Sequence, residues 1–203
     1  MLIKDFEVGH IGTNCYIVTD EKTLDCAVID PGDEGNTILS YTEENHLKVR
    51  AVFITHGHYD HTGAAAFVSE ETGAPIYIHE KDVGKVGESY RYAPEKDIKH
   101  YAESDRIRVG GLIFEVFETP GHSAGSVTLR CQDALFPGDL LFRDSCGRTD
   151  LPGGSMEDLL RSLKKIASLS GDYEVYPGHL QSTTLDHERR YNEYMRYAMA
   201  GGK

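Results

Sequence analysis

Thr55-His56-Gly57-His58-Tyr59-Asp60-His61 is the stretch that decides the fold. It places three histidines and one aspartate between an apolar run at residues 51–54 and a helix-prone run at residues 62–68. This pattern predicts that a buried strand ends here and that a helix begins. His56 and His58 are two residues apart in an extended segment, so their side chains point to the same side. Such a cluster indicates a metal-binding site.

The composition is that of an acidic chain long enough to bury one large core. The chain has 203 residues and a formal net charge of −12. Because no low-complexity linker divides it, we expect a single domain over residues 1–203. No run of Lys or Arg forms a surface that would follow phosphates, so nucleic acid is not an expected partner. A small-molecule substrate fits this charge balance better.

The sequence contains no recognisable targeting or membrane-spanning segment. Charges at positions 4, 5 and 7 interrupt the beginning of the chain, and no apolar run is long enough to cross a bilayer. The four cysteines are widely spaced, which suits reduced thiols better than a disulfide framework. We therefore expect a cytoplasmic protein without a membrane partner, whose oligomeric state the sequence leaves open.

The apolar pattern of the first half predicts strands followed by alternating strands and helices. The expected strands cover residues 2–8, 13–19, 26–29, 49–54 and 75–78, and the expected helices cover residues 34–45 and 62–71. The second helix should end at Gly73. This order predicts an α/β fold in which helices cover one face of a sheet.

Residues 80–106 are polar, and we expect a lid or an edge segment there. Tyr90, Tyr92 and Tyr101 are candidates either for substrate contacts or for half-exposed packing.

The second half repeats the arrangement of strands that end in glycine-rich turns. We expect a strand at 112–117, a hairpin of 127–131 with 134–136, a loop at 143–154 and a strand at 174–176. Ser155 and Asp158 predict a capping box at the start of a helix. The core stripe of that helix should be Met156, Leu159, Leu160, Leu163 and Ala167. One terminal helix should bury Tyr191, Met195, Ala198 and Met199.

Four of these strands end in candidate metal ligands. The ligands are His56, His58, Asp60 and His61, then His122, Asp139 and His179. Seven ligands are too many for one tetrahedral zinc, but two ions that share a carboxylate would use them all. Imidazoles and carboxylates without a thiolate fit zinc, iron or manganese. Glycines beside the ligands, at 57, 121, 138 and 178, would let the backbone pass close to the ions.

The sequence resembles the metallo-β-lactamase-fold hydrolases over nearly its whole length. The motifs that carry the resemblance are Thr13-Asn14-Cys15-Tyr16, Asp30-Pro31-Gly32, the Thr55 to His61 stretch, Pro120-Gly121-His122-Ser123, Gly138-Asp139 and Pro177-Gly178-His179. The resemblance implies a four-layered αββα sandwich, in which two mixed sheets are flanked by helices and the site lies at the sheet edges.

The same resemblance implies a role for each ligand. His56, His58 and His122 would hold the first ion, and Asp60, His61 and His179 would hold the second. Asp139 would bridge the two ions, so that Asp60 and Asp139 are the candidate catalytic residues. Asp30 would orient a ligand. We expect two divalent ions per chain, zinc in the first place, with iron and manganese as alternatives.

Within this superfamily, the loop at 145–154 resembles the short, single-domain type of glyoxalase II, which hydrolyses S-acylglutathione thioesters such as S-lactoylglutathione. Thr183-Thr184 and Glu188-Arg189-Arg190 carry the same resemblance. The chain departs from the larger members in lacking their C-terminal helical domain, and in having Leu180-Gln181 after His179. In the loop, Arg148 is a candidate to pair with a substrate carboxylate. Cys146 is a candidate to line the substrate site, as a passive thiol.

The ligand set implies a mechanism. Two divalent cations lower the pKa of a shared water from ~15.7 towards ~7, so that a bridging hydroxide can attack a thioester carbonyl. A thiol with a pKa near ~8.5 then leaves without a strong acid. Three alternatives stay open: a persulfide dioxygenase with one Fe(II) on His56, His122 and Asp139, a lactonase of the same fold, and a non-catalytic metal-binding scaffold. We expect His10, His46, His79, His100 and His187 to lie outside the site.

Overall fold

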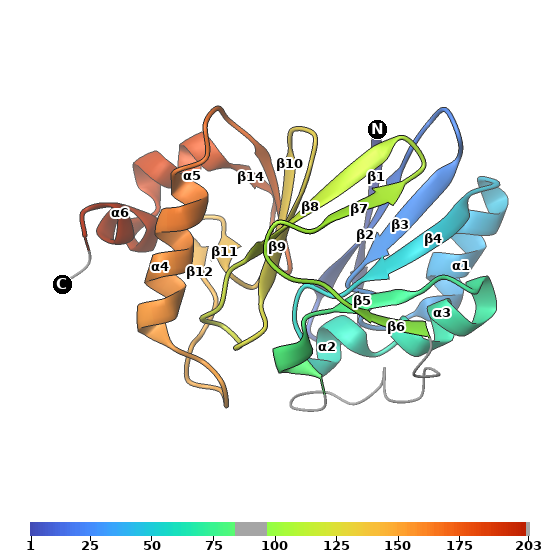
Figure 1. Cartoon of the computed structure of the whole chain (residues 1–203), viewed down its shortest axis with the longest axis horizontal. Coiled ribbons are helices and arrows are strands. Elements are labelled where there is room, and N and C mark those ends of the chain that lie inside the picture. The colour runs from blue at the N-terminus through green and yellow to red at the C-terminus, as the bar shows by residue number, and fades with distance from the viewer. Residues whose placement is uncertain (84–96, 202–203) are drawn as a thin grey trace.

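Two six-stranded sheets pack against each other in the computed structural model, which describes residues 1–83 and 97–201 (Figure 1). The first sheet has its strands in chain order: β1 (Leu2–Val8), β2 (Thr13–Thr19), β3 (Asp25–Ile29), β4 (Lys48–Phe53), β5 (Ile76–Ile78) and β6 (Ile98–His100). The second sheet has the spatial order β14 (Thr183–Thr184), β13 (Glu174–Pro177), β10 (Ala134–Gly138), β9 (Val127–Cys131), β8 (Leu112–Glu118) and β7 (Arg106–Val109). Both sheets contain parallel and antiparallel pairs.

Helices cover the outer face of each sheet, which makes the four layers αββα and confirms the predicted fold class (Figure 1). On the first sheet they are α1 (Gly35–Glu44), α2 (Tyr59–Thr62), α3 (Ala65–Thr72) and the short 3-10 helix η1 (Glu80–Asp82). On the second sheet they are α4 (Met156–Ala167), α5 (Leu185–Tyr191) and α6 (Glu193–Met199). A small hairpin of β11 (Leu141–Phe142) and β12 (Ser145–Cys146) precedes α4.

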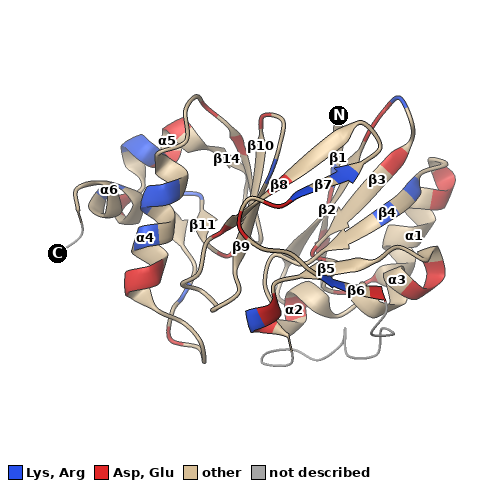
Figure 2. Cartoon of the chain, viewed as in Figure 1, with Lys and Arg blue, Asp and Glu red and all other residues tan. Residues whose placement is uncertain are grey.

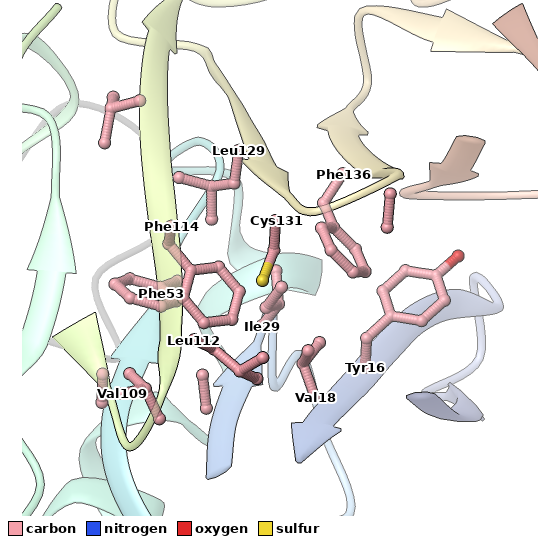
Figure 3. Packing of buried hydrophobic residues seen from close by; sticks show 14 of the residues in the cluster. Tyr16, Val18, Ile29, Phe53, Val109, Leu112, Phe114, Leu129, Cys131 and Phe136 are labelled. Carbon is pink, nitrogen blue, oxygen red and sulfur yellow. The ribbon is translucent and has the colours of Figure 1, made fainter. Parts of the chain in front are cut away.

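The strand β2 shows why both faces of the first sheet are buried. Tyr16 and Val18 pack in the cluster between the two sheets, whereas Cys15 and Ile17 pack in the cluster beneath α1 and α3. Since side chains alternate along a strand, one apolar run supplies both clusters. Figure 3 shows the cluster between the sheets, in which the rings of Phe53 and Phe114 lie 4.9 Å apart.

Lys, Arg, Asp and Glu lie on the outer helices and on the loops, and also on strands such as β4 and β7 (Figure 2). Within the described part of the chain, no helix combines the length and the apolar character needed to cross a membrane.

The helix predicted for residues 62–71 is present as α3 and ends at Gly73 as predicted, but its start is wrong, because the chain breaks between α2 and α3. At the break the N–H of Ala64 donates to the carbonyl of Pro31 at 2.8 Å. A Cβ on Gly63 would lie 2.0 Å from the carbonyl oxygen of Gly32. The turn after β3 therefore packs directly against this point and replaces a helical hydrogen bond.

The single terminal helix is also wrong, because Asn192 separates α5 from α6. Its side-chain oxygen accepts from the N–H groups of Tyr194 and Met195, so it caps the start of α6. Met195 is buried as predicted, together with Ala198. Of the same predicted face, however, Tyr191 is 62% exposed and Met199 is 46% exposed. The break turns the two ends of the stripe out of the core.

Helix α4 begins where the sequence predicts, with a cap that differs from the predicted one. Ser155 accepts from the N–H of Asp158, but its own N–H donates to Gly121 O at 2.8 Å, so the reciprocal half of the capping box is absent. Leu159, Leu163 and Ala167 are buried, and Leu160 packs beside them. Met156, the first residue of the helix, is the exception at 44% exposed.

The polar segment contains more regular structure than predicted. Residues 98–100 form the edge strand β6, but the edge strand β7 was not anticipated, because Arg106 and Arg108 interrupt its apolar pattern. Tyr101 is buried between the sheets, where its hydroxyl donates to Ile54 O. It is therefore neither half-exposed nor open to a substrate. Tyr90 and Tyr92 lie outside the described residues.

Candidate metal centre

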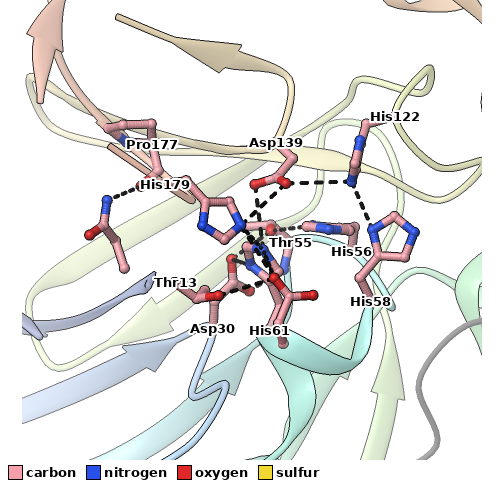
Figure 4. A network of polar contacts seen from close by, with 12 residues as sticks. Thr13, Asp30, Thr55, His56, His58, His61, His122, Asp139, Pro177 and His179 are labelled. Atoms are coloured by element: carbon pink, nitrogen blue, oxygen red, sulfur yellow. Dashed lines mark hydrogen bonds and ion pairs between the residues drawn. The ribbon is translucent and has the colours of Figure 1, made fainter. Parts of the chain in front are cut away.

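The seven predicted ligands converge at one edge of the sandwich, where the two sheets meet (Figure 4). The first sheet supplies the residues between the end of β4 and the end of α2. The second sheet supplies one residue after each of β8, β10 and β13. Strand ends at a common edge deliver side chains from distant parts of the chain to one place, which is why the sequence motifs can meet.

The ligands form two groups, and within each group the candidate ligand atoms lie within 4.8 Å of one another. The first group is His56, His58 and His122, and the second is Asp60, His61 and His179. In the first group, His58 Nδ1 lies 2.7 Å from His122 Nε2. In the second, His61 Nε2 lies 3.3 Å from His179 Nε2. The structure thus brings together the two sets that the resemblance implied.

Asp139 lies between the two groups. Its Oδ1 is 3.4 Å from His61 Nε2, and its Oδ2 is 3.5 Å from His122 Nε2 and 3.5 Å from His179 Nε2. The residue is only 8% exposed. This is the position of a carboxylate that two ions can share.

Three of the imidazoles are oriented by acceptors outside the cluster. The Nδ1 of His122 lies 2.7 Å from Arg148 O, and the Nδ1 of His179 lies 3.2 Å from Gly12 O. The Nδ1 of His61 lies 3.0 Å from Asp30 Oδ2. Because carbonyl and carboxylate oxygens only accept, each Nδ1 carries the proton. When the imidazole is neutral, each Nε2 therefore points a lone pair into the site, as a metal ligand must.

Asp30 also acts on His56, through Thr55. The Thr55 N–H donates to Asp30 Oδ1 at 2.7 Å, and its hydroxyl donates to Asp30 Oδ2 at 2.6 Å. The hydroxyl oxygen can then accept from His56 Nδ1, which lies 3.1 Å away. Asp30 itself has a left-handed backbone, with φ of 50°. The orienting role expected for Asp30 thus has a structural basis at two imidazoles, and Thr55 is a part of it that the sequence did not reveal.

The buried atoms of the cluster fit divalent cations. His56 Nε2 and Asp139 Oδ1 are buried and have no hydrogen-bond partner. A buried polar atom without a partner costs about 1–3 kcal/mol, and here several lone pairs also face one another. A cation between these atoms satisfies all of them at once. The residues present therefore fit the two-ion site that the ligand set predicts.

Ionisation in the metal-free state differs between the groups. Burial and the neighbouring imidazoles lower the pKa of His56 well below its usual value, and burial lowers the pKa of His58 to about 4. Burial also acts to lower the pKa of His61, but the carboxylates of Asp139 and Asp30 raise it to about 9. Although burial opposes it, hydrogen bonding to His179 holds the pKa of Asp60 below its usual range. His56 and His58 are therefore neutral near pH 7, whereas the second group pairs the ionised Asp60 with a protonated His61.

Gly178 shows how closely the backbone approaches the site. A Cβ at this position would lie 2.2 Å from Asp139 Oδ1 and 2.7 Å from His61 Cε1. No larger residue fits there without moving a ligand, which confirms the close approach predicted for this glycine.

Asp82, which the sequence analysis did not single out, ties the two histidine-bearing loops together. Its carboxylate accepts from Gly57 N at 2.9 Å, Ser123 Oγ at 2.6 Å and Gly125 N at 2.7 Å. The residue is buried in η1. It fixes the loop of His56 and His58 relative to the loop of His122. No local pattern signals it, because its partners are far away in sequence.

A pocket of about 750 Å³ opens over the cluster and is lined by both predicted substrate-binding residues. Arg148 is exposed, and its guanidinium forms two hydrogen bonds to Asp150, at 2.6 and 2.7 Å. Cys146 is half-buried, and burial raises the pKa of its thiol to about 11, so it stays protonated. Both residues are therefore placed at the site, with the arginine already paired to a carboxylate.

The five remaining histidines take no part in the two ligand groups. His79 follows a strand, so its place outside the site was the least secure of these five expectations. It is buried and lies 3.1 Å from Glu118. His187 belongs to a separate group with Asp144 and Glu188.

Comparison with known proteins agrees with this geometry. The model of the metallo-β-lactamase superfamily matches residues 8–179. An uncharacterised protein of Mycobacterium tuberculosis, Rv2581c, is 35% identical, over 96% of this chain and 98% of its own. The probable metallo-hydrolase YqgX of Bacillus subtilis is 35% identical, over 93% and 94%. The hydroxyacylglutathione hydrolase GloC of Haemophilus influenzae is 31% identical, over 96% and 98%.

Three solved structures are similar over almost their whole length. The B3 metallo-β-lactamase BLEG-1 has a TM-score of 0.86 at 32% identity, covering 96% of this chain and 99% of its own. ETHE1 from Myxococcus xanthus has a TM-score of 0.84 at 27% identity, covering 100% and 92%. TTHA1623, solved in a di-iron-bound form, has a TM-score of 0.83 at 33% identity, covering 94% and 99%.

Proposed function

Because the chain belongs to the metallo-β-lactamase superfamily, whose members are mostly hydrolytic enzymes, we propose that it is a metal-dependent hydrolase of S-acylglutathione-type thioesters. One observation carries the proposal: the second ligand group of Asp60, His61 and His179 is complete and shares Asp139 with the first. The likeness to GloC supports a thioester as the substrate class. The substrate is a small molecule, and the proposed location is the cytoplasm.

The proposed ions are held by the residues already described. His56, His58 and His122 would hold the first, Asp60, His61 and His179 would hold the second, and Asp139 would be shared. Two divalent cations bound there would lower the pKa of water and polarise a substrate carbonyl. We propose zinc, with iron and manganese as alternatives. The likeness to TTHA1623, which was solved in a di-iron-bound form, supports iron as an alternative.

The chain itself contributes orientation. The hydroxyl of Thr13 donates to Asp60 Oδ2 at 3.1 Å, and Asp30 holds the imidazole of His61. Asp60 and Asp139 are the proposed catalytic residues, because they fix the positions of the reacting groups in the second and the shared site. This orientation keeps the reacting groups in place before the substrate arrives.

The pocket favours a leaving group that needs no acid. Apart from the predicted ligands, the described side chains that line it are Ile11, Tyr59, Phe142, Ser145, Cys146, Arg148, Leu151 and Leu180. This set contains no histidine or carboxylate that could protonate an amine. A thiol with a pKa near ~8.5 leaves as the thiolate, so a thioester suits this pocket better than an amide.

The likeness to ETHE1 supports a second candidate, a persulfide dioxygenase with one Fe(II) on His56, His122 and Asp139. In that reaction the group of Asp60, His61 and His179 would bind no metal ion. The two candidates differ in the number of ions and in the use of oxygen.

Metal analysis of natively purified protein, combined with two assays, tests the proposal. We expect about two ions per chain and hydrolysis of S-lactoylglutathione without oxygen uptake. His58→Ala and His179→Ala should each abolish turnover and lower the metal content. His46→Asn is the matched control, because His46 is exposed, outside the site, and has the left-handed φ of 56° that Asn tolerates. One iron per chain with oxygen consumption on glutathione persulfide would establish the second candidate instead.

A further inference from the structure

The mouth of the pocket carries an unusual concentration of exposed apolar side chains. Leu180 is 63% exposed, Tyr59 is 52% exposed and Ile11 is 46% exposed, and all three line the pocket over the ligands. Phe142 and Leu151 line the same pocket. Single exposed apolar residues are ordinary on a protein surface, but several around one pocket mark a place where an apolar group binds.

Leu180 is held in this position against its backbone preference. Its φ is 68°, in the left-handed region that a leucine rarely adopts. The side-chain amide of Asn14 donates to Leu180 O at 2.8 Å and to Pro177 O at 3.0 Å, and the N–H of Asn14 donates to Gly178 O at 2.7 Å. These bonds fix the turn that carries His179. Strain that the surroundings maintain beside a reactive site points to a function for the strained residue.

Ile11 belongs to the same structural unit. Thr13 and His179 form an isolated antiparallel bridge, and the imidazole of His179 bonds to Gly12 O. The turn between β1 and β2 therefore lies beside the turn after β13. This brings the chain at Ile11 next to the chain at Leu180, so that the two form one wall next to a ligand of the second group.

Apart from the proposed ions, the described side chains of the pocket do not provide a site for a carboxylate. Among the lining residues that the structure describes, the only Lys or Arg is Arg148, and Asp150 already neutralises it. The carboxylates of a glutathione moiety are therefore better placed in solvent than inside the pocket. The acyl group is the part of an S-acylglutathione that can lie against an apolar wall.

We propose that Leu180 and Ile11 form an acyl-binding wall, and that the preferred substrates are thioesters with an extended apolar acyl chain, larger than lactoyl. This inference rests on the proposed function and specifies its substrate class. Each methylene that the wall removes from water should improve kcat/KM or binding by about two- to fourfold, until the pocket is filled.

The test measures binding separately from turnover. S-methyl-, S-butyl- and S-hexylglutathione are thioethers that cannot be hydrolysed, and their dissociation constants for the metal-loaded protein are measured by calorimetry. The same chain lengths are then compared as S-acylglutathiones in the thioesterase assay. We expect affinity and kcat/KM to rise together with chain length.

Leu180→Asn removes the apolar side chain but suits the left-handed backbone, so the variant should fold at least as stably as the wild type. It should flatten the dependence on chain length in both measurements. Leu24→Asn is the matched control, because Leu24 is also exposed, at 40%, with φ of 60°, and lies in the turn between β2 and β3 away from the pocket. The control should keep the wild-type dependence.

The outcomes separate the two proposals. A wild-type binding series that is flat or undetectable, or a Leu180→Asn variant that keeps the full dependence on chain length, overturns the acyl-binding wall. If the thioethers bind with the expected dependence while no thioester is hydrolysed, the wall stands and the proposed thioesterase function fails.

Discussion

The hydroxyl of Thr55 donates a hydrogen bond to Asp30 Oδ2 at 2.6 Å, and this bond lets the Asp30 carboxylate orient a second imidazole of the site. His61 bonds to Asp30 directly, and His56 lies 3.1 Å from the Thr55 hydroxyl. Since the two histidines belong to different ligand groups, Asp30 couples the geometry of the first ion to that of the second. This relationship can be broken at Thr55 without removing any ligand.

Thr55→Val should weaken metal binding without abolishing it. The substitution keeps the shape of the side chain but removes the hydroxyl that orients His56 and leaves one bond to Asp30 unmade. Loss of such an orienting partner typically lowers metal affinity by about 10- to 100-fold. Competition with a chromophoric chelator measures the affinity, and Thr55→Ser, which retains the hydroxyl, should restore most of it. Equal affinities for the valine variant and the wild type would contradict the assigned role.

Gly178→Ala should disturb the shared ligand. The new Cβ would meet Asp139 Oδ1 at 2.2 Å, so either the carboxylate or the turn must move. We expect fewer than two ions per chain by elemental analysis and a loss of turnover. Gly73→Ala is the contrasting control, since Gly73 has open space around it but a φ of 69°. It should lower the free energy of unfolding by about 1–2 kcal/mol and leave the metal content unchanged.

Asp82→Asn should loosen the contact between the two histidine-bearing loops. The amide nitrogen of Asn cannot accept from the N–H and hydroxyl donors that surround Asp82, so a buried donor loses its partner. We expect the free energy of unfolding in urea to fall by about 1–3 kcal/mol. Asp172→Asn is a fair comparison, because its exposed carboxylate also accepts from two backbone N–H groups. Both donors there bond to the same oxygen, which Asn retains, and the site is exposed to water, so a change as large as that at Asp82 would refute the assignment.

The stability of the metal-free protein should depend on pH through His58 and His61. Between about pH 6.5 and 4 the unfolded chain binds a proton at His58 that the folded chain does not, so the free energy of unfolding falls as the pH falls. Between pH 6.5 and about 9 the folded chain keeps a proton on His61 that the unfolded chain releases, so this contribution falls as the pH rises. Denaturation of chelator-treated protein across this range should show both limbs. His58→Gln should reduce the acid limb, to which His56 still contributes, and leave the alkaline limb unchanged.

The sequence could predict that the seven candidate ligands lie together, because each belongs to a local pattern. An apolar strand, a glycine-containing turn and a histidine or aspartate recur four times, and strands of one sandwich end at a common edge. The four-layered fold could be predicted because these motifs resemble those of a known family. Residue type and position relative to a strand were sufficient here.

Other features depend on contacts between distant residues, and the sequence pattern did not reveal them. The break between α2 and α3 arises because the turn at Pro31 packs against Ala64, while the local sequence remains helix-prone. Asp82 bonds to residues 25 to 43 positions away. Tyr101 looked like a residue of a polar loop, but it is buried between the sheets. In each case tertiary packing overrides the local preference.

The ligands are divided between the halves of the sandwich, four from the first sheet and three from the second. An ion bound between them joins the two layers at this edge, in addition to the hydrogen bonds that Asn14 makes to the turn after β13. Ligation to the folded state at a free metal concentration 100 times the dissociation constant adds about 2.7 kcal/mol against unfolding. The lifetime of this protein under heat or proteolysis will therefore follow the metal supply of its surroundings.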